Sequence, residues 1–316
     1  MEGETTFRKF ARYAWFALGY NVLVIVWGVF LRASRSGDGC GEHWLTCNGE
    51  LIPSAPQFKT VIEFSHRMTT AVDGIVMLIL LGWTIWIWNK SRTIRSRQIL
   101  YAAIGSFFFV ITEAAVGAGL VLTGNVAENV TDARPFWAMG HLINTFVLLT
   151  FLTLTAWFAS GDRKFLLKPD TKTILLIFLG VIGLLFVGLS GSLAALSSML
   201  YPSQSLAEGV AKDFSSTSHL ILRLRLSHPI LSILTSVYLI FIAGWLKAKS
   251  GDANVGWWSN AVSLLVVIQV LFGGATLLTL GPIVMQLGHL LLADAVWIAF
   301  VLLVASYLNS AKEDLS

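Results

Sequence analysis

The sequence predicts an all-α integral membrane protein with eight transmembrane helices, arranged as two tandem four-helix bundles in a parallel, same-orientation pseudo-repeat. Three observations support this fold class. Of the 316 residues, 55% are hydrophobic and only 13% are charged, whereas about a quarter of the residues of a soluble domain are charged. The mean hydropathy is +0.72. Eight apolar runs approach or exceed the roughly 20 residues that one bilayer crossing requires.

The apolar runs follow one another at regular intervals, which favours helices joined by connections of moderate length. They span residues 14–33, 62–88, 98–122, 136–158, 173–196, 219–245, 257–280 and 283–307. The first run follows three basic residues and in this respect is similar to a signal peptide. Its length suits a full crossing better, so we expect a helix there.

The basic residues set the predicted orientation. Fourteen lie in the two tails and the second, fourth and sixth loops, against five in the opposite loops and helix ends. The positive-inside rule therefore places both termini in the cytoplasm, with the protein in the cell (inner or plasma) membrane. Loops 34–61, 123–135 and 197–217 would face outward. Because topology accounts for the basic residues, the net charge of +4 gives no sign of a nucleic-acid partner; membrane lipid is the expected surrounding.

Three short motifs recur in the second half of the chain, which indicates an internal repeat. The pairs are Ser65-His66 with Ser227-His228, Glu113-x-x-x-Gly117 with Gln269-x-x-x-Gly273, and Gly140-His141-Leu142 with Gly288-His289-Leu290. An even number of helices in each half gives the halves the same orientation. We therefore predict an N-terminal half over residues 1–165 and a C-terminal half over residues 166–316.

Four histidines occupy the repeat positions: His66, His141, His228 and His289. All lie in even-numbered predicted helices near their outward ends, so they share a depth. Ionisable groups inside a membrane are rare and usually functional. Paired imidazoles facing across a bundle suit an iron porphyrin with two axial histidines. Zinc normally needs a third or fourth ligand, and no Cys or carboxylate recurs in both halves.

Other polar and small residues near these histidines leave two interpretations open. Thr70, Asp73, Asn144, Asp294 and Glu113 either line a polar pocket or proton path, or serve as structural hydrogen-bond partners. Glycines in the neighbouring helices either allow close helix packing or leave room for a flat macrocycle. These glycines are Gly117, Gly119, Gly188, Gly191, Gly273 and Gly274.

The first half alone combines an acid, a histidine and a cysteine pair. Glu63 lies three residues before His66, on the same helix face, and Cys40 and Cys47 lie in the preceding outward loop. Glu63 also fits a capping box with Thr60, which is a structural alternative. The cysteines suit a structural disulfide on the oxidising side of the membrane, or a redox-active pair.

Cations near the histidines are candidates for binding haem propionates. Arg67 serves this role in the first half, and Arg223 or Arg225 in the second; snorkelling at a helix end is the alternative for the latter two. The repeat offset maps Glu63 onto Arg225 and Arg67 onto Pro229. One half therefore looks reactive, and the other looks like a cofactor holder.

The order of these motifs resembles bacterial haem A synthase over nearly the whole chain. The resemblance rests on Gly37-Asp-Gly-Cys40-Gly-x-x-Trp44-x-x-Cys47-x-Gly49, then Glu63-x-x-His66-Arg67, then Gly140-His141. It implies an oxidoreductase that oxidises the C8 methyl group of haem O to a formyl group, making haem A for terminal oxidase assembly. Haem O synthase would supply the substrate, and the pattern does not specify the electron acceptor.

The resemblance also implies roles for individual residues. His66 and His141 would bind the substrate haem, with Glu63 as a catalytic acid/base or charge stabiliser beside it. His228 and His289 would bind a permanent haem b, and Cys40 and Cys47 would form a disulfide that bears on the first-half site.

The chain departs from the family pattern at three places. A second cysteine pair, which some members carry in a later outward loop, is absent from the sequence. Pro229 stands where an arginine commonly follows the histidine. Glu113 stands where a glutamine, like Gln269, is more usual.

Two other classes of protein compete with this interpretation. A dihaem b-type electron carrier, or the membrane anchor of a quinol enzyme, normally staggers its haems across the bilayer, whereas both predicted sites lie on the outward side. A transporter built from parallel repeats would need broken helices and a site at the midplane.

Overall fold

The computed structural model describes residues 2–161, 163–165 and 168–310, and within these residues it is all-helical, with ten helices. They are α1 (Glu2–Ala33), α2 (Phe58–Ser91), α3 (Ile94–Leu122), α4 (Arg134–Ala159), α5 (Thr171–Leu200), α6 (Leu206–Phe214), α7 (Leu220–Leu224), α8 (Ser227–Ser250), α9 (Ala253–Leu278) and α10 (Ile283–Asn309). Eight stretches of this described chain are long and apolar enough to cross a membrane. The chain is therefore a multi-pass membrane protein, as the sequence predicts.

The predicted helix over residues 219–245 is interrupted, which corrects the sequence analysis. α7 ends at Leu224 and α8 begins at Ser227. Pro229 is the third residue of α8; it has no N–H, and its ring would clash with the carbonyl of Arg225 in a continuous helix. The amide of His228 instead donates to the carbonyl of Arg225 at 3.1 Å, a tight-turn contact. His228 therefore lies directly after the break.

A short helix also lies where the sequence predicts an outward loop. Ser205 caps α6 by accepting a bond from the amide of Glu208, and Lys212 pairs with Glu208 one turn later. Arg225 reaches back to this helix, donating to Asp213 and to the carbonyl of Gly209. The break before α8 thus places a guanidinium where it holds α6 against the bundle.

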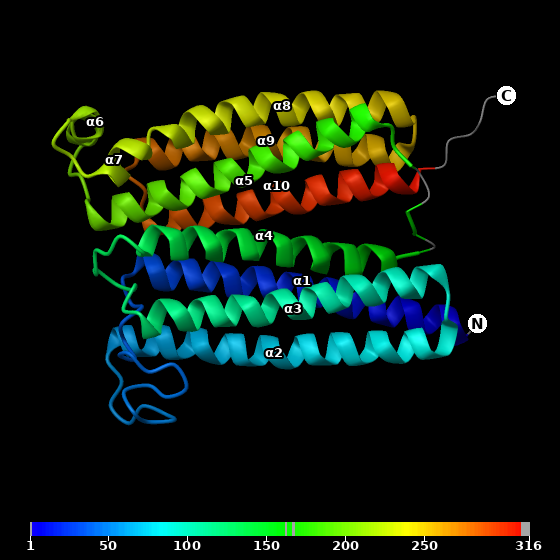
Figure 1. Ribbon diagram of the computed structural model, residues 1–316, viewed down its shortest axis with the longest axis horizontal. Coiled ribbons are helices and arrows are strands. Elements are labelled where there is room, and N and C mark those ends of the chain that lie inside the picture. Colours follow the sequence, from blue (N-terminus) through cyan, green and yellow to red (C-terminus); the bar gives the residue numbers. More distant parts are fainter. Residues whose placement is uncertain (1, 162, 166–167, 311–316) are drawn as a thin grey trace.

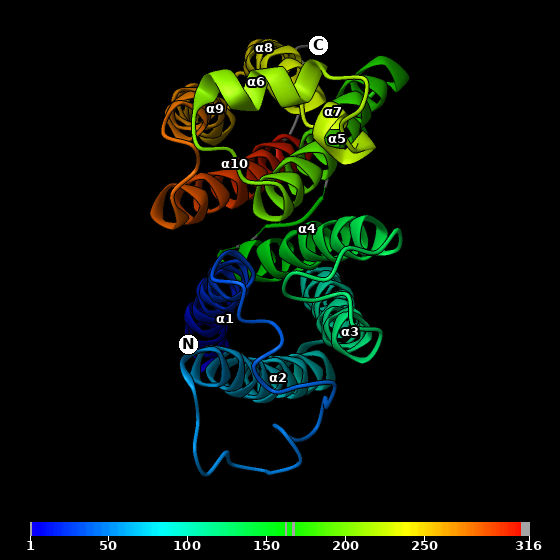
Figure 2. The same ribbon diagram turned by 90° about the vertical axis from the view of Figure 1, so that its left-hand side faces the viewer.

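The helices form two groups that lie side by side, α1–α4 in one and α5–α10 in the other (Figure 2). α4 lies between them: it contacts α1 and α3 of its own group and α5 and α10 of the other. It is the most buried of the crossing segments described, with 61% of an 18-residue apolar stretch buried inside the protein. The ring of Phe146 on α4 stacks on Trp297 of α10 at a centroid distance of 4.6 Å. The predicted boundary at 165/166 falls at a linker, and residues 166–167 lie outside the described residues.

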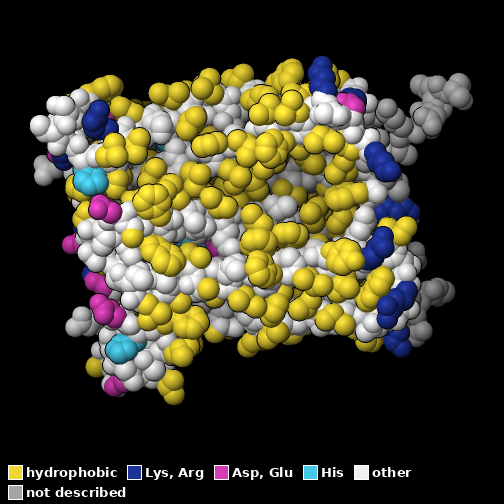
Figure 3. Space-filling model, in the orientation of Figure 1, with side chains coloured by type: hydrophobic (Ala, Val, Ile, Leu, Met, Phe, Trp, Pro, Cys, Tyr) yellow, Lys and Arg dark blue, Asp and Glu magenta, His cyan; other side chains and the backbone are white. Residues whose placement is uncertain are grey.

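The two ends of the molecule differ in charge and in the segments they carry. The start of α1 and the end of α10 lie at one end, which we call the terminal end, and residues 34–57, α6 and α7 lie at the other, the loop end (Figure 1). Lys and Arg side chains gather at the terminal end, with an apolar belt between the ends (Figure 3). At the terminal end Lys249 pairs with Asp170, the N-cap of α5, and holds the pKa of that carboxyl well below its usual range.

The contact between α4 and α5, which joins the two groups of helices, leads to a prediction about Gly188. A Cβ at Gly188 on α5 would lie 2.7 Å from Phe146 and 2.8 Å from Leu142, both on α4. We expect Gly188→Leu to destabilise the protein by about 1–3 kcal/mol through overpacking and to lower the Tm of the detergent-solubilised protein. Gly244→Leu is the control, since a Cβ there would meet no atom of another helix or side chain within 4 Å among the described residues; an equal loss in both variants would contradict the prediction.

Candidate functional site

The loop that carries the cysteines, residues 34–57, is folded back onto the start of α2. We call it the Cys loop. Cys40 and Cys47 form the predicted disulfide and are 0% and 2% exposed. A thiolate reaches a disulfide only where the sulfur atoms are accessible, so this burial favours the structural alternative over a redox-active pair.

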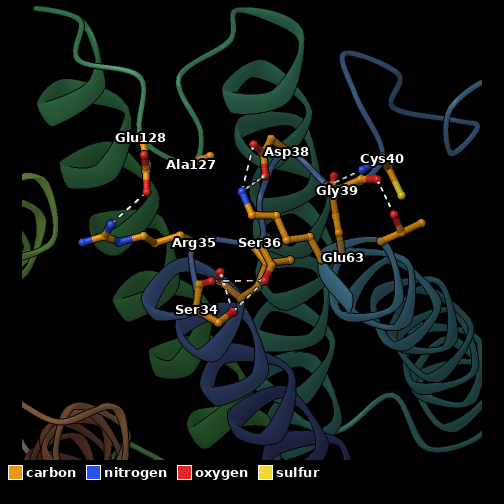
Figure 4. A network of polar contacts seen from close by, with 12 residues as sticks. Ser34, Arg35, Ser36, Asp38, Gly39, Cys40, Glu63, Ala127 and Glu128 are labelled. Carbon is orange, nitrogen blue, oxygen red and sulfur yellow. Dashed lines mark hydrogen bonds and ion pairs between the residues drawn. The ribbon is translucent and has the colours of Figure 1, made fainter. Parts of the chain in front are cut away.

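Glu63 holds the Cys loop rather than capping α2. Its carboxylate, only 3% exposed, accepts a 2.8 Å bond from the backbone amide of Cys40 (Figure 4) and a 2.5 Å charge-assisted bond from Arg67. The N-cap of α2 is Gln57, so the capping-box alternative with Thr60 is wrong. The hydroxyl of Thr60 instead donates to the carbonyl of Gly39.

Arg67 completes this attachment. Its guanidinium donates to the carbonyl oxygens of Trp44 and Thr46 as well as to Glu63. The three contacts of Arg67 are all to other residues of the protein. Its role in binding a propionate therefore stays a prediction. Gly39 allows the close approach of the loop: a Cβ there would lie 2.4 Å from the backbone of Lys59.

All four repeat histidines lie near the loop end. Each is within the first nine residues of a helix that starts there, α2, α4, α8 or α10, which corresponds to a depth of at most about 12 Å at 1.5 Å per residue. His66 and His141 lie near enough to interact electrostatically. His228 and His289 face each other directly, with ring centroids 6.2 Å apart and planes at 87°.

The spacing of His228 and His289 fits one iron between them. Metal–imidazole bonds are about 2 Å long, so two rings bound on opposite sides of one iron have centroids roughly 6 Å apart. Nδ1 of His228 lies 3.2 Å from the carbonyl of Val187 and 3.2 Å from the hydroxyl of Ser190. Such a contact fixes the ring and leaves Nε2 for a metal.

Three of the histidines lie against a glycine of a neighbouring helix. A Cβ would be 3.0 Å from the His66 ring at Gly28, 2.9 Å from the His228 ring at Gly191, and 2.7 Å from the His289 ring at Gly273. Gly119 and Gly188 serve helix packing, whereas Gly191 and Gly273 make room for imidazoles. That the glycines leave room for a macrocycle stays a prediction. Gly28, in α1, was missed because α1 carries no repeated motif.

The fourth histidine, His141, contacts a carboxylate. Its Nδ1 lies 3.2 Å from Oε1 of Glu113 on α3. Asn144 and Thr145 also donate to this carboxylate. Asn144 is therefore a structural hydrogen-bond partner, one of the two alternatives left open by the sequence.

Of the other polar residues near the histidines, Asp73 and Thr70 have hydrogen-bond partners, whereas the role of Asp294 stays unassigned. Asp73 faces α1 and accepts a 2.8 Å bond from Asn21, and the exposed Thr70 bonds to the carbonyl of Arg67. Asp294 is 1% exposed, and its carboxylate has no hydrogen-bond partner among the residues that the structure describes. No group of three or more His, Cys, Asp or Glu residues within these residues is placed to share a metal ion.

One cation near the first-half histidines was missed by the sequence analysis. Arg32, in the last turn of α1, is partly buried and lies near His141 and Arg134. Arg134 donates to the carbonyls of Ala127 and Asn129, whereas the guanidinium of Arg32 has no hydrogen-bond partner in the described chain. The sequence does hold one indication of a role for Arg32, because it lies on the side of the membrane that carries few basic residues. Arg223 is exposed, and Arg225 is bound to α6 as described above.

An apolar depression borders the same site. It lies between α3 and α4, has a volume of about 330 Å³, and is lined by Val116, Ala133, Phe136, Trp137 and Gly140. Gly140 directly precedes His141 in α4.

The amino-acid sequence is similar to a known protein family and to several named proteins. The COX15-CtaA family model, described as cytochrome oxidase assembly protein, matches residues 11–301. The chain is 26% identical over 289 residues to a heme A synthase of Bacillus cereus, covering 90% of this chain and 88% of that protein. It is 36% identical over 131 residues to a heme A synthase of Halalkalibacterium halodurans, covering 42% of each.

A relative of a different name matches almost the whole chain. It is a protoheme IX farnesyltransferase of Thermus thermophilus, 40% identical over 302 residues, which are 95% of this chain and 49% of that protein. The chain thus spans about half the length of this relative.

The contacts of Arg67 make a prediction about the Cys loop. Arg67→Ala removes both bonds to the loop carbonyls and leaves the buried Glu63 without its cation. We expect faster hydrogen exchange at the amides of residues 40–47. Arg223→Ala, which removes an exposed guanidinium, should leave this exchange unchanged; unchanged exchange in Arg67→Ala would show that the loop is held by other contacts.

Proposed function

The chain belongs to the COX15-CtaA family of cytochrome oxidase assembly proteins, and on this premise we propose that it is a haem A synthase. The proposed reaction oxidises the C8 methyl group of haem O to a formyl group. The observation that carries the proposal is the asymmetry between two histidine pairs at one depth: only the first is accompanied by a buried carboxylate tied to a disulfide loop. The heme A synthases of Bacillus cereus and Halalkalibacterium halodurans support it.

We assign the first histidine pair to the substrate and the second to a permanent haem b. The centroid distance of 6.2 Å between His228 and His289 supports the second assignment. When bound there, haem b supplies a one-electron relay. Ser190 and Val187 orient the ring of His228 for ligation.

The first-half residues hold and orient the substrate. His66 and His141 bind its iron, and Arg32 pairs with a propionate, because it is the guanidinium near His141 that the protein leaves without a partner. The apolar depression beside Gly140 takes the farnesyl-derived tail of haem O. Arg67, Arg223 and Arg225 remain proposed as further propionate contacts.

Glu63 accepts protons released as the methyl group is oxidised, or stabilises the charge that develops there. Its burial and its bond to the amide of Cys40 support a fixed position at the loop end. The Cys40–Cys47 disulfide keeps the loop folded over the first half.

We place the protein in the cell membrane with both termini in the cytoplasm and the Cys loop outside. The concentration of Lys and Arg at the terminal end supports this orientation (Figure 3). The relative from Thermus thermophilus carries the name of a farnesyltransferase on a chain of which this protein matches 49%. This supports a haem O synthase as the partner that supplies the substrate, with a terminal oxidase as the destination of the product.

An electron carrier with two b-type haems is the alternative function. Pigment extraction distinguishes the two, because a synthase purified from cells with a haem O source yields haem O or haem A beside haem B. A carrier yields haem B alone, and that result would overturn the proposal.

The role of Glu63 is tested by Glu63→Ala and Glu63→Gln in cells with a haem O source. The Gln variant keeps an acceptor for the amide of Cys40 but loses the charge. We expect both variants to retain haem b and to form no haem A, measured by chromatography of extracted pigments. Glu128→Gln, at an exposed ion pair with Arg35, is the control. Normal haem A in the Ala variant would remove Glu63 from the mechanism.

The haem b site is tested by Gly273→Ala against Gly274→Ala. A Cβ at position 273 meets the ring of His289, whereas no atom lies within 4 Å of one at position 274. An overpacking cost of about 1–3 kcal/mol would weaken haem binding roughly five- to 150-fold. We expect a lower haem-to-protein ratio only in Gly273→Ala, measured from the reduced-minus-oxidised spectrum; equal ratios would contradict the assignment of His289.

A further inference from the structure

The histidine of α4 and the histidine of α10 differ in what lies behind them. Nδ1 of His141 lies 3.2 Å from Oε1 of Glu113, whose side chain is 17% exposed. Glu113 is in the middle of α3, nine residues before its end at the loop end. The carboxylate thus reaches the ring from within the bundle, on the side away from the loops.

The surroundings of Glu113 fix its carboxylate as a hydrogen-bond acceptor. The amide of Asn144 donates to Oε2 and the hydroxyl of Thr145 donates to Oε1, each at 2.5 Å. Asn144 is itself oriented, because it donates to the carbonyl of Phe109 and accepts from Thr112. The side-chain nitrogen of Asn144 can only donate, so a carboxylate oxygen that accepts fits this position.

The second half has an amide at the corresponding place. Gln269 directs its Nε2 to the backbone carbonyl of His289, at 3.0 Å. Neither Oε1 of Gln269 nor Nδ1 of His289 has a hydrogen-bond partner among the described residues. The facing ring, His228, contacts a carbonyl and a hydroxyl. Both second-half imidazoles are therefore backed by neutral groups.

A carboxylate oxygen 3.2 Å from Nδ1 places negative charge beside the imidazole, which makes the opposite nitrogen a stronger electron donor to a bound metal. A stronger donor stabilises the oxidised iron, so the reduction potential falls. Resting on the proposed function, we infer that Glu113 acts through His141 as a positioning residue that makes the iron held by the first half easier to oxidise than the iron held by the second.

This inference gives the two halves a direction of electron transfer. One electron leaves the ferrous iron of the first half, which becomes ferric, and reduces the ferric iron of the second half to ferrous. No bond forms or breaks in this step. Glu113 thus favours electron transfer from the substrate haem to the second-half haem. The difference between the halves at Glu63 does not account for this direction.

The test is a matched exchange of the two side chains, Glu113→Gln and Gln269→Glu, in full-length protein loaded with haem B in both halves. Spectroelectrochemical titration resolves one component for each haem. In Glu113→Gln we expect the first-half component to shift to a more positive potential by about 59 mV, a tenfold change for a one-electron couple. In Gln269→Glu we expect the second-half component to shift to a more negative potential.

A structural role for Glu113 would change haem occupancy without this pattern, so the low-spin ferric signal in electron paramagnetic resonance is recorded as a second measure of the ligand field at His141. Potentials and signals unchanged in Glu113→Gln, with haem A still formed from haem O, would overturn the inference and leave the proposed function intact. A wild-type protein that takes up only one haem would overturn both. If Glu113→Gln does not fold, the reduction potential of the second-half haem in Gln269→Glu tests the inference instead. An unchanged potential in that variant would overturn it.

Discussion

A polar side chain that lies between helices in hydrocarbon has to find its partner within the protein. This constraint accounts for most polar contacts between the crossing helices here. Asp73 is paired with Asn21, and the indole of Trp297 donates to Thr150 across the two groups of helices. The rings of His66, His141 and His289 differ from these, because their Nδ1 atoms have no hydrogen-bond partner within the described residues; Nδ1 of His141 lies 3.2 Å from Oε1 of Glu113. Other buried polar atoms without a partner in the described chain include the carboxylate oxygens of Asp294 and Oε1 of Gln269.

The two halves meet this constraint in different ways, and the difference is what gives them different chemistry. In the first half, carboxylates stand at both ends of the site: Glu63 binds the Cys loop, and Glu113 binds the ring of His141. In the second half, the corresponding positions hold Arg225, which is bound to α6, and the neutral Gln269. Carboxylates therefore stand at these two positions beside the first pair of histidines, and neither corresponding position beside the second pair holds one.

The sequence predicted the crossing helices and the depth of the histidines because both follow from one-dimensional patterns of hydropathy and spacing. It did not predict the break before His228, although Pro229 was visible, because a proline in a long apolar run also occurs in kinked helices. The sequence also did not predict the contacts between segments that are far apart along the chain. Nothing in the local sequence shows that Arg67 reaches two carbonyls of the Cys loop or that Gly28 of α1 lies against His66.

The shared depth of the histidines also limits what the two sites can do together. All four rings lie within about 12 Å of the helix ends at the loop end, and α4 and α5 connect the two groups side by side. An electron that passes from one site to the other therefore moves parallel to the membrane plane and does no work against the transmembrane potential. Its direction has to come from the protein, through groups that stabilise oxidised iron at one site more than at the other. The carboxylate behind His141 and the amide behind His289 provide that difference in a geometry that otherwise repeats.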